Sequence, residues 1–225
     1  MKTITASKGK TCKPPYIPED EKLTSDQLQG AYDEIAGEYE KRVWFDQYLL
    51  GVARRRKQLL SKAHGKILDV ACGTGLNFPY FPETCELTAV DLSPRMLNEA
   101  RRRAADLNLK IRIHAMDAEK LEFADGSFDT VTSTLSTCTF PDPIQALREM
   151  KRVCRMGGLI LLLEHGHSNL RWLANFQDRN VLPHYQQSAG CRWNQDPLDL
   201  VKTAGLVIVD HKRFGLGMFH TIVAT

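Results

Sequence analysis

Short apolar runs alternate with longer amphipathic stretches along most of the chain. A short apolar run bounded by turn residues is typical of a buried strand, and apolar positions three and four residues apart are typical of a helix that buries one face. This pattern predicts seven strands, at residues 66–71, 87–91, 110–115, 128–134, 158–164, 206–211 and 218–224. Helical patterns fill most of the intervals, and such alternation predicts an α/β fold.

Turn residues define several of the element boundaries. Ser93 and Pro94 supply an N-cap and a first helical residue for the helix after the second strand. Another helix begins at Pro143 and is expected to end at the glycine pair Gly157–Gly158, before the fifth strand. The segment KRFGLG between the last two strands is too brief for a crossover helix, so the final strand is predicted to run antiparallel to its neighbour.

The part of the chain before the first strand has a different character. Residues 1–28 are rich in Lys, Pro and Glu, and we expect a flexible leader there. Residues 29–62 form amphipathic helical stretches, which either pack on the outer face of the sheet or close over a pocket as a lid. We therefore expect one domain at 29–225, with a helical lid at 29–62 and an insertion at 169–196 before the sixth strand.

Length and composition favour a single globular domain. The chain has 225 residues, of which 43% are hydrophobic and 25% charged, as in ordinary soluble proteins. Its longest aliphatic run, residues 159–163, is far shorter than the roughly 20 residues of a membrane helix. The N-terminus has no apolar core of a secretion signal. These features predict a cytoplasmic protein, and the aromatic and basic residues of 29–62 permit peripheral contact with an anionic membrane.

Charge and cysteine spacing exclude several classes of function at this stage. A formal net charge of +3 does not by itself indicate nucleic acid, and the basic runs at 53–57 and 100–103 are expected to be solvated helix faces. The six cysteines show neither a CxxC pair nor a Cys/His cluster with zinc spacing. We therefore expect free thiols, with no disulfide framework, no metal site and no nucleic-acid partner.

The segment KILDVACGTGLNF marks a ligand-binding turn after the first strand. Asp69 lies in the apolar run, and Gly73 and Gly75 allow a tight turn that brings the backbone close to a ligand. An acid ahead of the glycines would repel a phosphate, so a cationic ligand is favoured over a dinucleotide.

Two further acids extend this site across the ends of the next strands. Asp91 ends the second strand, 22 residues after Asp69, where a carboxylate can accept both hydroxyls of a ribose. Asp117 follows the third strand, where it could accept from an adenine amino group. A ligand with an ammonium, a ribose and an adenine, but no phosphate, describes S-adenosylmethionine.

Several motifs, taken in their order, carry a resemblance to a known family. They are YDEIAGEYEKR, ILDVACGTGLNFPYFP, LTAVDLSPRMLNEAR, MDAEKLEFADGSFDTVTSTLSTCTFPDP, ALREMKRVCRMGGLILLLEHG and GCRWNQDPLDLVKTAGLVI. From about Tyr32 to the C-terminus, the chain resembles the class I S-adenosylmethionine-dependent methyltransferases, in the branch with quinone C-methyltransferases, phosphatidylethanolamine N-methyltransferases and alkyl-thiol S-methyltransferases. The resemblance implies a Rossmann-like seven-stranded sheet with its last strand antiparallel, helices on both faces and S-adenosylmethionine as cofactor.

The resemblance also implies which residues contact the cofactor. They are Tyr39 over the bound cofactor, with Tyr32 beside it; Asp69, Ala71, Gly73 and Gly75 at its methionine and ribose; Asp91 at the ribose hydroxyls; Leu92 and Met96 beside the adenine; Asp117 and Ala118 at the adenine edge; and Thr134 and Leu135 at the methionine side. Ala71 stands where the family pattern has glycine, a change of one methyl group that we expect to be tolerated.

The acceptor side offers fewer signals, because methyl transfer from a sulfonium needs positioning more than acid/base chemistry. His165, at the end of the fifth strand, could deprotonate an acceptor near neutral pH, or it could bond to the backbone there. His184 and Tyr185 in the insertion could line the acceptor pocket. Cys138 lies near the expected transfer position, where packing as a small apolar residue is favoured.

The choice of acceptor stays open between several classes. Motifs such as LSTCTFPDP most resemble the thiol enzymes. The motif YDEIAGEY, however, looks equally like the phospholipid N-methyltransferases. The thiol enzymes carry an N-terminal membrane anchor that this sequence does not show. We expect a small or lipid-like apolar acceptor, methylated at a thiol sulfur or a phospholipid amine, with quinone C-methylation or a macromolecular acceptor, protein or RNA, as alternatives. The segment STLS replaces the aromatic-proline tetrapeptide that an RNA enzyme would show after strand four.

Overall fold

The computed structural model describes residues 17–225, and its centre is a seven-stranded sheet with the order β3-β2-β1-β4-β5-β7-β6. The strands are β1 (Lys66–Val70), β2 (Glu86–Asp91), β3 (Ile111–Ala115), β4 (Phe128–Thr134), β5 (Cys154–His165), β6 (Ile208–Phe214) and β7 (Phe219–Ala224). β7 pairs antiparallel with both β5 and β6, and the pairs from β3 to β5 are parallel. All seven predicted strands and the reversed last strand are confirmed.

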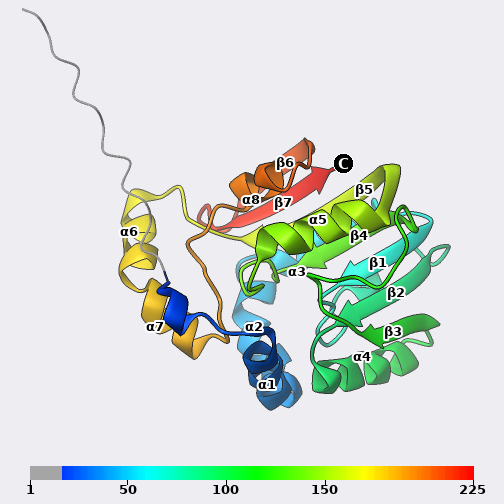
Figure 1. Cartoon of the computed structure of the whole chain (residues 1–225), viewed down its shortest axis with the longest axis horizontal. Helices are drawn as coiled ribbons and strands as arrows, with labels where there is room; N and C mark the ends of the chain where they lie inside the picture. Colours follow the sequence, from blue (N-terminus) through cyan, green and yellow to red (C-terminus); the bar gives the residue numbers. More distant parts are fainter. Residues whose placement is uncertain (1–16) are drawn as a thin grey trace, which may run out of the picture.

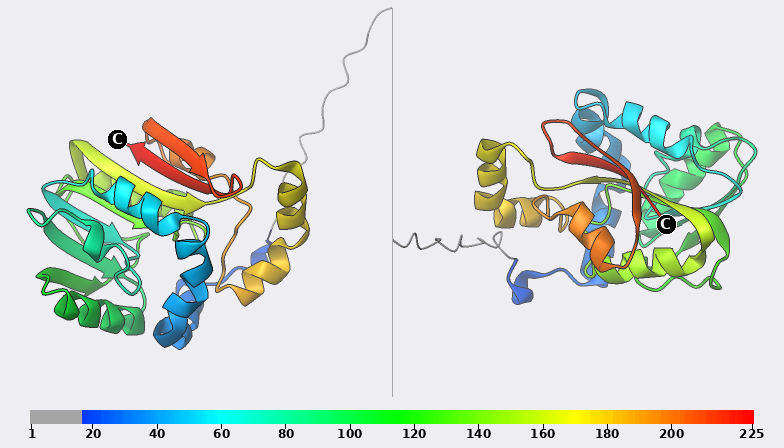
Figure 2. Two further views of the ribbon diagram at one scale, coloured as in Figure 1. Left: turned by 180° about the vertical axis from the view of Figure 1, so that it is seen from behind. Right: turned by 90° about the horizontal axis from the view of Figure 1, so that it is seen from above.

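Helices cover both faces of the sheet, as predicted. The helices are α1 (Ser25–Ile35), α2 (Tyr39–Tyr48), α3 (Val52–Leu60), α4 (Pro94–Asp106), α5 (Pro143–Val153), α6 (Arg171–Arg179), α7 (Val181–Gln187) and α8 (Pro197–Thr203), with short 3-10 turns η1 (Glu19–Glu21), η2 (Ala36–Glu38) and η3 (Phe78–Tyr80). α5 crosses the front of the sheet in Figure 1, and α3 crosses it in the view from behind in Figure 2.

Strand alternation divides the core into two layers. Ile67 packs with α3 and α4 on one face, whereas the next residue, Leu68, packs with α5 and α8 on the other. Successive side chains of a strand point to opposite faces, so a strand buried on both faces is apolar throughout. The continuous apolar runs of the sequence follow from this arrangement.

The boundary between α5 and β5 differs from the prediction. α5 ends at Val153 and β5 begins at Cys154, so the helix does not continue to the glycine pair. Gly157 has φ of 74°, and a Cβ at Gly158 would lie 2.7 Å from the carbonyl oxygen of Asp129. These glycines therefore permit a bend and a close approach between β5 and β4 where the register shifts.

The N-terminal helices occupy two different places. α3 contacts β5 and β7, whereas α1 contacts α4 and lies with α2 beyond the carboxyl ends of the parallel strands, toward which the arrows point in Figure 1. The proposed lid segment 29–62 thus contains a sheet-covering part, α3, and a part beside the strand ends. The chain turns between them at Gly51, which has φ of 76°.

The predicted leader boundary at residue 28 is wrong, because it falls inside α1. Thr24 caps α1 in a capping box with Gln27, and Ile17 is buried against Val181 and Tyr185 of α7. Residues 1–16 of the predicted leader lie outside the described residues. Within the described part of the chain, no helix has the length and apolar character needed to cross a membrane.

The basic run at 53–57 is only partly a solvated face. Arg56 is 3% exposed, and its guanidinium donates to the Gln47 side chain at 2.9 Å. Burial lowers the pKa of Arg56, although the Tyr39 and Asp69 side chains oppose this shift. Arg56 therefore forms part of the interior between α2 and α3, while its neighbour Arg54 remains exposed.

Candidate active site

A first pocket lies at the carboxyl ends of β1, β2 and β4, under α1. Its wall contains most of the predicted cofactor residues, namely Tyr39, Ala71, Gly73, Asp91, Leu92, Met96, Asp117, Ala118, Thr134 and Leu135. It also contains Tyr32, and residues that the sequence analysis did not place there, among them Ser25, Leu28 and Gln29 of α1, Met116, and residues 139–141. The strand ends and α1 therefore enclose one pocket together.

The turn after β1 is held open toward this pocket by Asp91. The Gly73 N–H donates to Asp91 Oδ2 at 2.8 Å, and the Ser93 N–H donates to Oδ1 at 2.9 Å. Gly73 has φ of 56°, and a Cβ built on it meets no atom within 4 Å. Ala71, with φ of 53°, adopts the same left-handed backbone without being glycine. The turn thus presents bare backbone and free space to a ligand.

Asp69 and Gly75 do not line the pocket; their contacts lie on the side of the turn that faces the protein interior. Asp69 is fully buried, and its Oδ1 accepts from Asn77 Nδ2 and Thr132 Oγ1, each at 2.8 Å. Burial raises the pKa of Asp69 to about 6. A Cβ on Gly75 would lie 2.5 Å from the Phe78 ring. Neither residue lines the first pocket, so their direct contact with the cofactor stays a prediction, and their observed role is to position the turn.

The opposite end of the first pocket is closed by α1. Ser25 Oγ lies 3.2 Å from Asp117 Oδ2 and donates to it, while Asp117 Oδ1 accepts from the Glu119 N–H at 2.9 Å. Asp33 of α1 also accepts from Ser93 Oγ at 2.6 Å. These bonds join the N-terminal helix to the turns that follow β2 and β3.

These residues fit an adenosyl ligand with a cationic amino-acid end. Asp69 Oδ2 is buried without a hydrogen-bond partner in the described part of the chain, and the space above Gly73 is open. Asp91 is a fixed carboxylate beside Met96 and Ala118, whose apolar surfaces suit a purine ring. Asp91 and the Gly73 turn would hold the ribose and methionine parts, and Met96 and Ala118 the adenine.

A second pocket adjoins the first and has a volume of about 420 Å³. The two pockets share Tyr32, Tyr39, Leu135 and Thr139. The rest of its wall is mainly apolar or aromatic and comes from α2, β7 and the insertion. A volume of this size is in the range of small-molecule sites.

The predicted catalytic residues divide between this pocket and the core. His165 and His184 line the second pocket, and the His184 ring stacks on Trp193 with centroids 3.9 Å apart. Tyr185 is 6% exposed, lines neither pocket, and accepts from the Leu23 N–H through its hydroxyl at 2.9 Å. Tyr185 thus anchors the N-terminal segment, and the predicted catalytic position is corrected.

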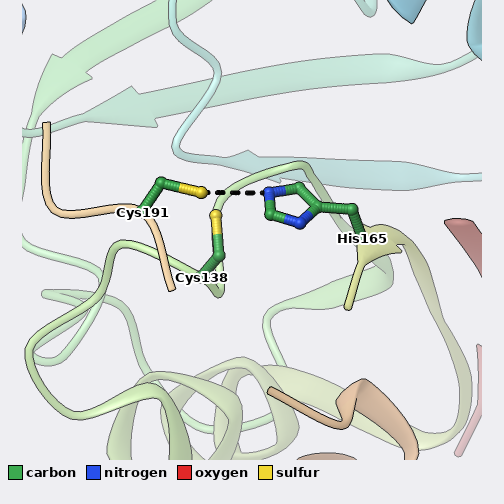
Figure 3. A group of neighbouring side chains, drawn as sticks. All are labelled: Cys138, His165 and Cys191. Carbon is green, nitrogen blue, oxygen red and sulfur yellow. Dashed lines mark hydrogen bonds between the residues drawn. The ribbon is translucent and has the colours of Figure 1, made fainter. Parts of the chain in front are cut away.

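The structure also brings together three residues that sequence spacing did not connect. The donor atoms of Cys138, His165 and Cys191 all lie within 4.8 Å of one another in the second pocket, and His165 Nε2 is 3.3 Å from Cys191 Sγ (Figure 3). The adjacent Cys191 sulfur and burial raise the pKa of the Cys138 thiol well above its usual value. The sequence spacing predicted no cluster of cysteine and histidine, and the folded chain forms one.

Glu164, next to His165, is a buried acid that should make stability depend on pH. Burial raises its pKa to about 7, so between pH 4.5 and 7 the unfolded chain releases a proton that the folded chain retains. The free energy of unfolding should therefore fall with rising pH, by about 3 kcal/mol in total from this group. Urea unfolding between pH 5 and 8 measures this fall, which should be present in the wild-type chain and absent from Glu164→Gln. The exposed-site variant Glu122→Gln should keep the pH dependence of the wild type. Parallel curves for wild type and Glu164→Gln would contradict this assignment.

Comparisons with known proteins agree with the cofactor-side geometry. A family model described as a methyltransferase domain matches residues 68–162. The mitochondrial methyltransferase OMS1 of Saccharomyces cerevisiae is 28% identical over 86% of this chain and 45% of its own. The phosphatidylethanolamine N-methyltransferase of Cereibacter sphaeroides is 34% identical over 50% of this chain and 56% of its own. The ubiquinone/menaquinone biosynthesis C-methyltransferase UbiE of Bdellovibrio bacteriovorus is 36% identical over 57% of this chain and 59% of its own.

The matched region contains the strands and turns that build the first pocket. These matches support a place for the chain among the class I S-adenosylmethionine-dependent methyltransferases. It spans about half the length of the relatives it matches. A solved methyltransferase structure from Thermotoga maritima, described as a possible histamine N-methyltransferase, shares the fold, with a TM-score of 0.66, 22% identity, and coverage of 88% of this chain and 99% of its own. The cofactor of this methyltransferase family is S-adenosylmethionine.

Loss of the Asp91 carboxylate should weaken cofactor binding. Asp91→Ala removes the proposed ribose acceptor and the partner of the Gly73 N–H, so S-adenosylmethionine should bind about 1 to 3 kcal/mol more weakly. Calorimetry of the purified chain measures this change. Asp129→Ala is the matched control, because Asp129 also accepts a backbone N–H, from Lys66 at 2.7 Å, but lies outside both pockets. Equal affinity of Asp91→Ala and wild type would remove the ribose assignment.

Proposed function

We propose that this chain transfers the methyl group of S-adenosylmethionine to a small or lipid-like apolar acceptor, at a thiol sulfur or a phospholipid amine nitrogen. The observation that carries the proposal is the second pocket, which shares four wall residues with the cofactor pocket. When bound, the cofactor supplies a methyl group already activated on a sulfonium. An acceptor in the second pocket would then lie beside the cofactor pocket, and positioning can supply much of the rate.

The side chains of the shared wall support binding of the cofactor in the first pocket and of the acceptor in the second. Tyr32 and Tyr39 lie between the pockets with ring centroids 6.3 Å apart, where they exclude water from the space that the reacting groups would occupy. Burial raises the pKa of Tyr39 to about 12, so its hydroxyl stays neutral. His165 lines the acceptor pocket, where an imidazole that holds no metal ion would serve as a general base toward an acceptor.

Exposed apolar residues near the acceptor pocket favour a lipid-like acceptor, or an acceptor that the chain takes from a membrane surface. Trp44, Phe45, Tyr48 and Leu49 at the end of α2 are 53%, 55%, 68% and 61% exposed, and Phe45 also lines the second pocket. Aromatic side chains of this kind insert into the headgroup region of bilayers. Peripheral membrane contact through the end of α2 is therefore part of the proposal, and sedimentation with anionic vesicles tests it through Trp44→Ser and Phe45→Ser.

A turnover screen with matched variants tests the proposed acceptor pocket. Purified chain is assayed for formation of S-adenosylhomocysteine with apolar thiols, phospholipid amines, quinols and RNA. Val43→Trp, which fills the second pocket from α2, should lower kcat/KM for the accepted substrate about tenfold or more without changing cofactor affinity. Leu49→Trp on the exposed end of the same segment should leave the acceptor pocket intact.

Three outcomes would overturn the proposal. Turnover with RNA alone would move the chain to the macromolecular class. Full activity of Val43→Trp on a small acceptor would show that this pocket does not bind it. Turnover with a quinol would instead favour the C-methylation that the name of one relative records.

A further inference from the structure

The strongest unexplained feature of the second pocket is a set of sulfur and nitrogen donors from three separate segments. Cys138 lies in the loop after β4, His165 is the last residue of β5, and Cys191 follows α7 in the insertion. Figure 3 shows the three side chains pointing toward one another from these segments. All three line the pocket, and Cys138 and Cys191 are 2% and 8% exposed.

The distances suit a tetrahedral metal centre. Zinc binds cysteine sulfur at about 2.3 Å and histidine nitrogen at about 2.0 Å, which separates an S and an N ligand of one tetrahedron by roughly 3.5 Å. His165 Nε2 lies 3.3 Å from Cys191 Sγ, and every pair of the three donor atoms is within 4.8 Å. Small side-chain rotations would therefore bring all three donors to one ion.

The backbone around the three donors is fixed by bonds that do not use the donor atoms. Arg192 donates from its backbone N–H and its Nε to the Cys138 carbonyl, at 3.0 and 3.1 Å, which ties the insertion to the loop after β4. Glu164 accepts from the Ser136 and Thr137 N–H groups at 3.2 and 3.3 Å, which ties the same loop to β5. A site held in this way from outside is preorganised for a ligand.

We propose that Cys138, His165 and Cys191 bind one zinc-like divalent cation, whose fourth coordination position opens into the acceptor pocket and takes the sulfur of a thiol acceptor. Three protein ligands with one open position are the arrangement of catalytic zinc sites, whereas structural sites use four. Coordination of the acceptor forms a metal–sulfur bond and releases the thiol proton to solvent. The choice of a thiol rests on the proposed function; the metal site itself does not.

Metal binding by the full chain tests the site directly. The reduced protein, freed of metal with a chelator and kept in a phosphine reductant, is titrated with Co²⁺ and Zn²⁺. We expect one equivalent to bind, with the strong visible absorption of tetrahedral Co²⁺ and sulfur-to-cobalt charge transfer. Cys138→Ser, Cys191→Ser and His165→Asn should each weaken binding about 100-fold or more. Cys85→Ser and Cys154→Ser are matched controls, because these cysteines lie outside the cluster and should not alter it.

The open position has its own readout, independent of turnover. Butanethiol should shift the Co²⁺ spectrum of the loaded chain, and butylamine at the same concentration should not. Less than one tenth of an equivalent of bound metal, or binding unaffected by the three cluster variants, would overturn the site. A bound metal whose spectrum ignores butanethiol would overturn the thiol assignment. Because these measurements require no methyl transfer, their failure is distinct from failure of the turnover screen.

Discussion

Replacing Gly73 by valine should abolish binding of S-adenosylmethionine, with a loss of at least about 100-fold in affinity, while the chain remains folded. The position above Gly73 is open space in the first pocket, since a Cβ there meets no atom within 4 Å. A branched side chain would fill the room that the methionine and ribose parts need. It would also strain the turn, because φ of 56° is unfavourable for a β-branched residue.

The effect of strain can be separated from the effect of lost space. Gly157 has φ of 74° and also meets no atom within 4 Å on addition of a Cβ, but it lies at the start of β5, outside both pockets. Gly157→Val thus carries similar backbone strain without touching the site. Calorimetric affinity and thermal unfolding of the two variants should show lost binding in Gly73→Val alone. A Gly73→Val chain that binds the cofactor normally would place the cofactor elsewhere.

The sheet and the cofactor side were predictable because they depend on local patterns. Strands buried on both faces are continuous apolar runs, and Asp91 ends one of them. Asp117 comes two residues after the edge strand β3. The carboxyl ends of parallel strands meet at one edge, so residues distant in sequence were correctly expected together. The start of β5 was missed because residues 155–157 are exposed and do not continue the apolar run of the rest of the strand.

The N-terminal boundary was missed although a signal was present. Thr24 and Gln27 form the spacing of a capping box, which marks a helix start at Ser25. That signal moves α1 out of the leader and toward the cofactor pocket. The leader was predicted from its content of charged residues and proline, and this composition does not show where a helix begins.

The acceptor side depended on contacts that no local pattern encodes. Cys138 and Cys191 are 53 residues apart in the chain, and their proximity follows from how the insertion folds back on the loop after β4. The hydroxyl of Tyr185 bonds to Leu23, which is 162 residues away. Sequence spacing cannot reveal such pairs, because tertiary packing of an insertion determines them.

Tyr39→Ala should lower kcat about 100-fold or more, with a smaller loss of cofactor affinity, once an acceptor is identified. Tyr39 is one of the four residues that line both pockets, so its ring forms part of the wall where methyl transfer would take place. Removing the ring admits water and loosens the alignment of the two reactants, and misalignment of about 1 Å can cost that much. The effect should therefore fall on the chemical step more than on binding.

Tyr39→Phe is the control that separates the ring from the hydroxyl. Because burial raises the pKa of Tyr39 to about 12, the hydroxyl is neutral and is not expected to act as a base near neutral pH. Tyr39→Phe should then keep kcat within a few fold of wild type, while Tyr32→Ala, from the same wall, should resemble Tyr39→Ala. Single-turnover rates at saturating cofactor measure all three. If Tyr39→Phe lost as much as Tyr39→Ala, the hydroxyl would contribute to the reaction itself; if Tyr39→Ala kept its rate, the shared wall would not enclose the transfer step.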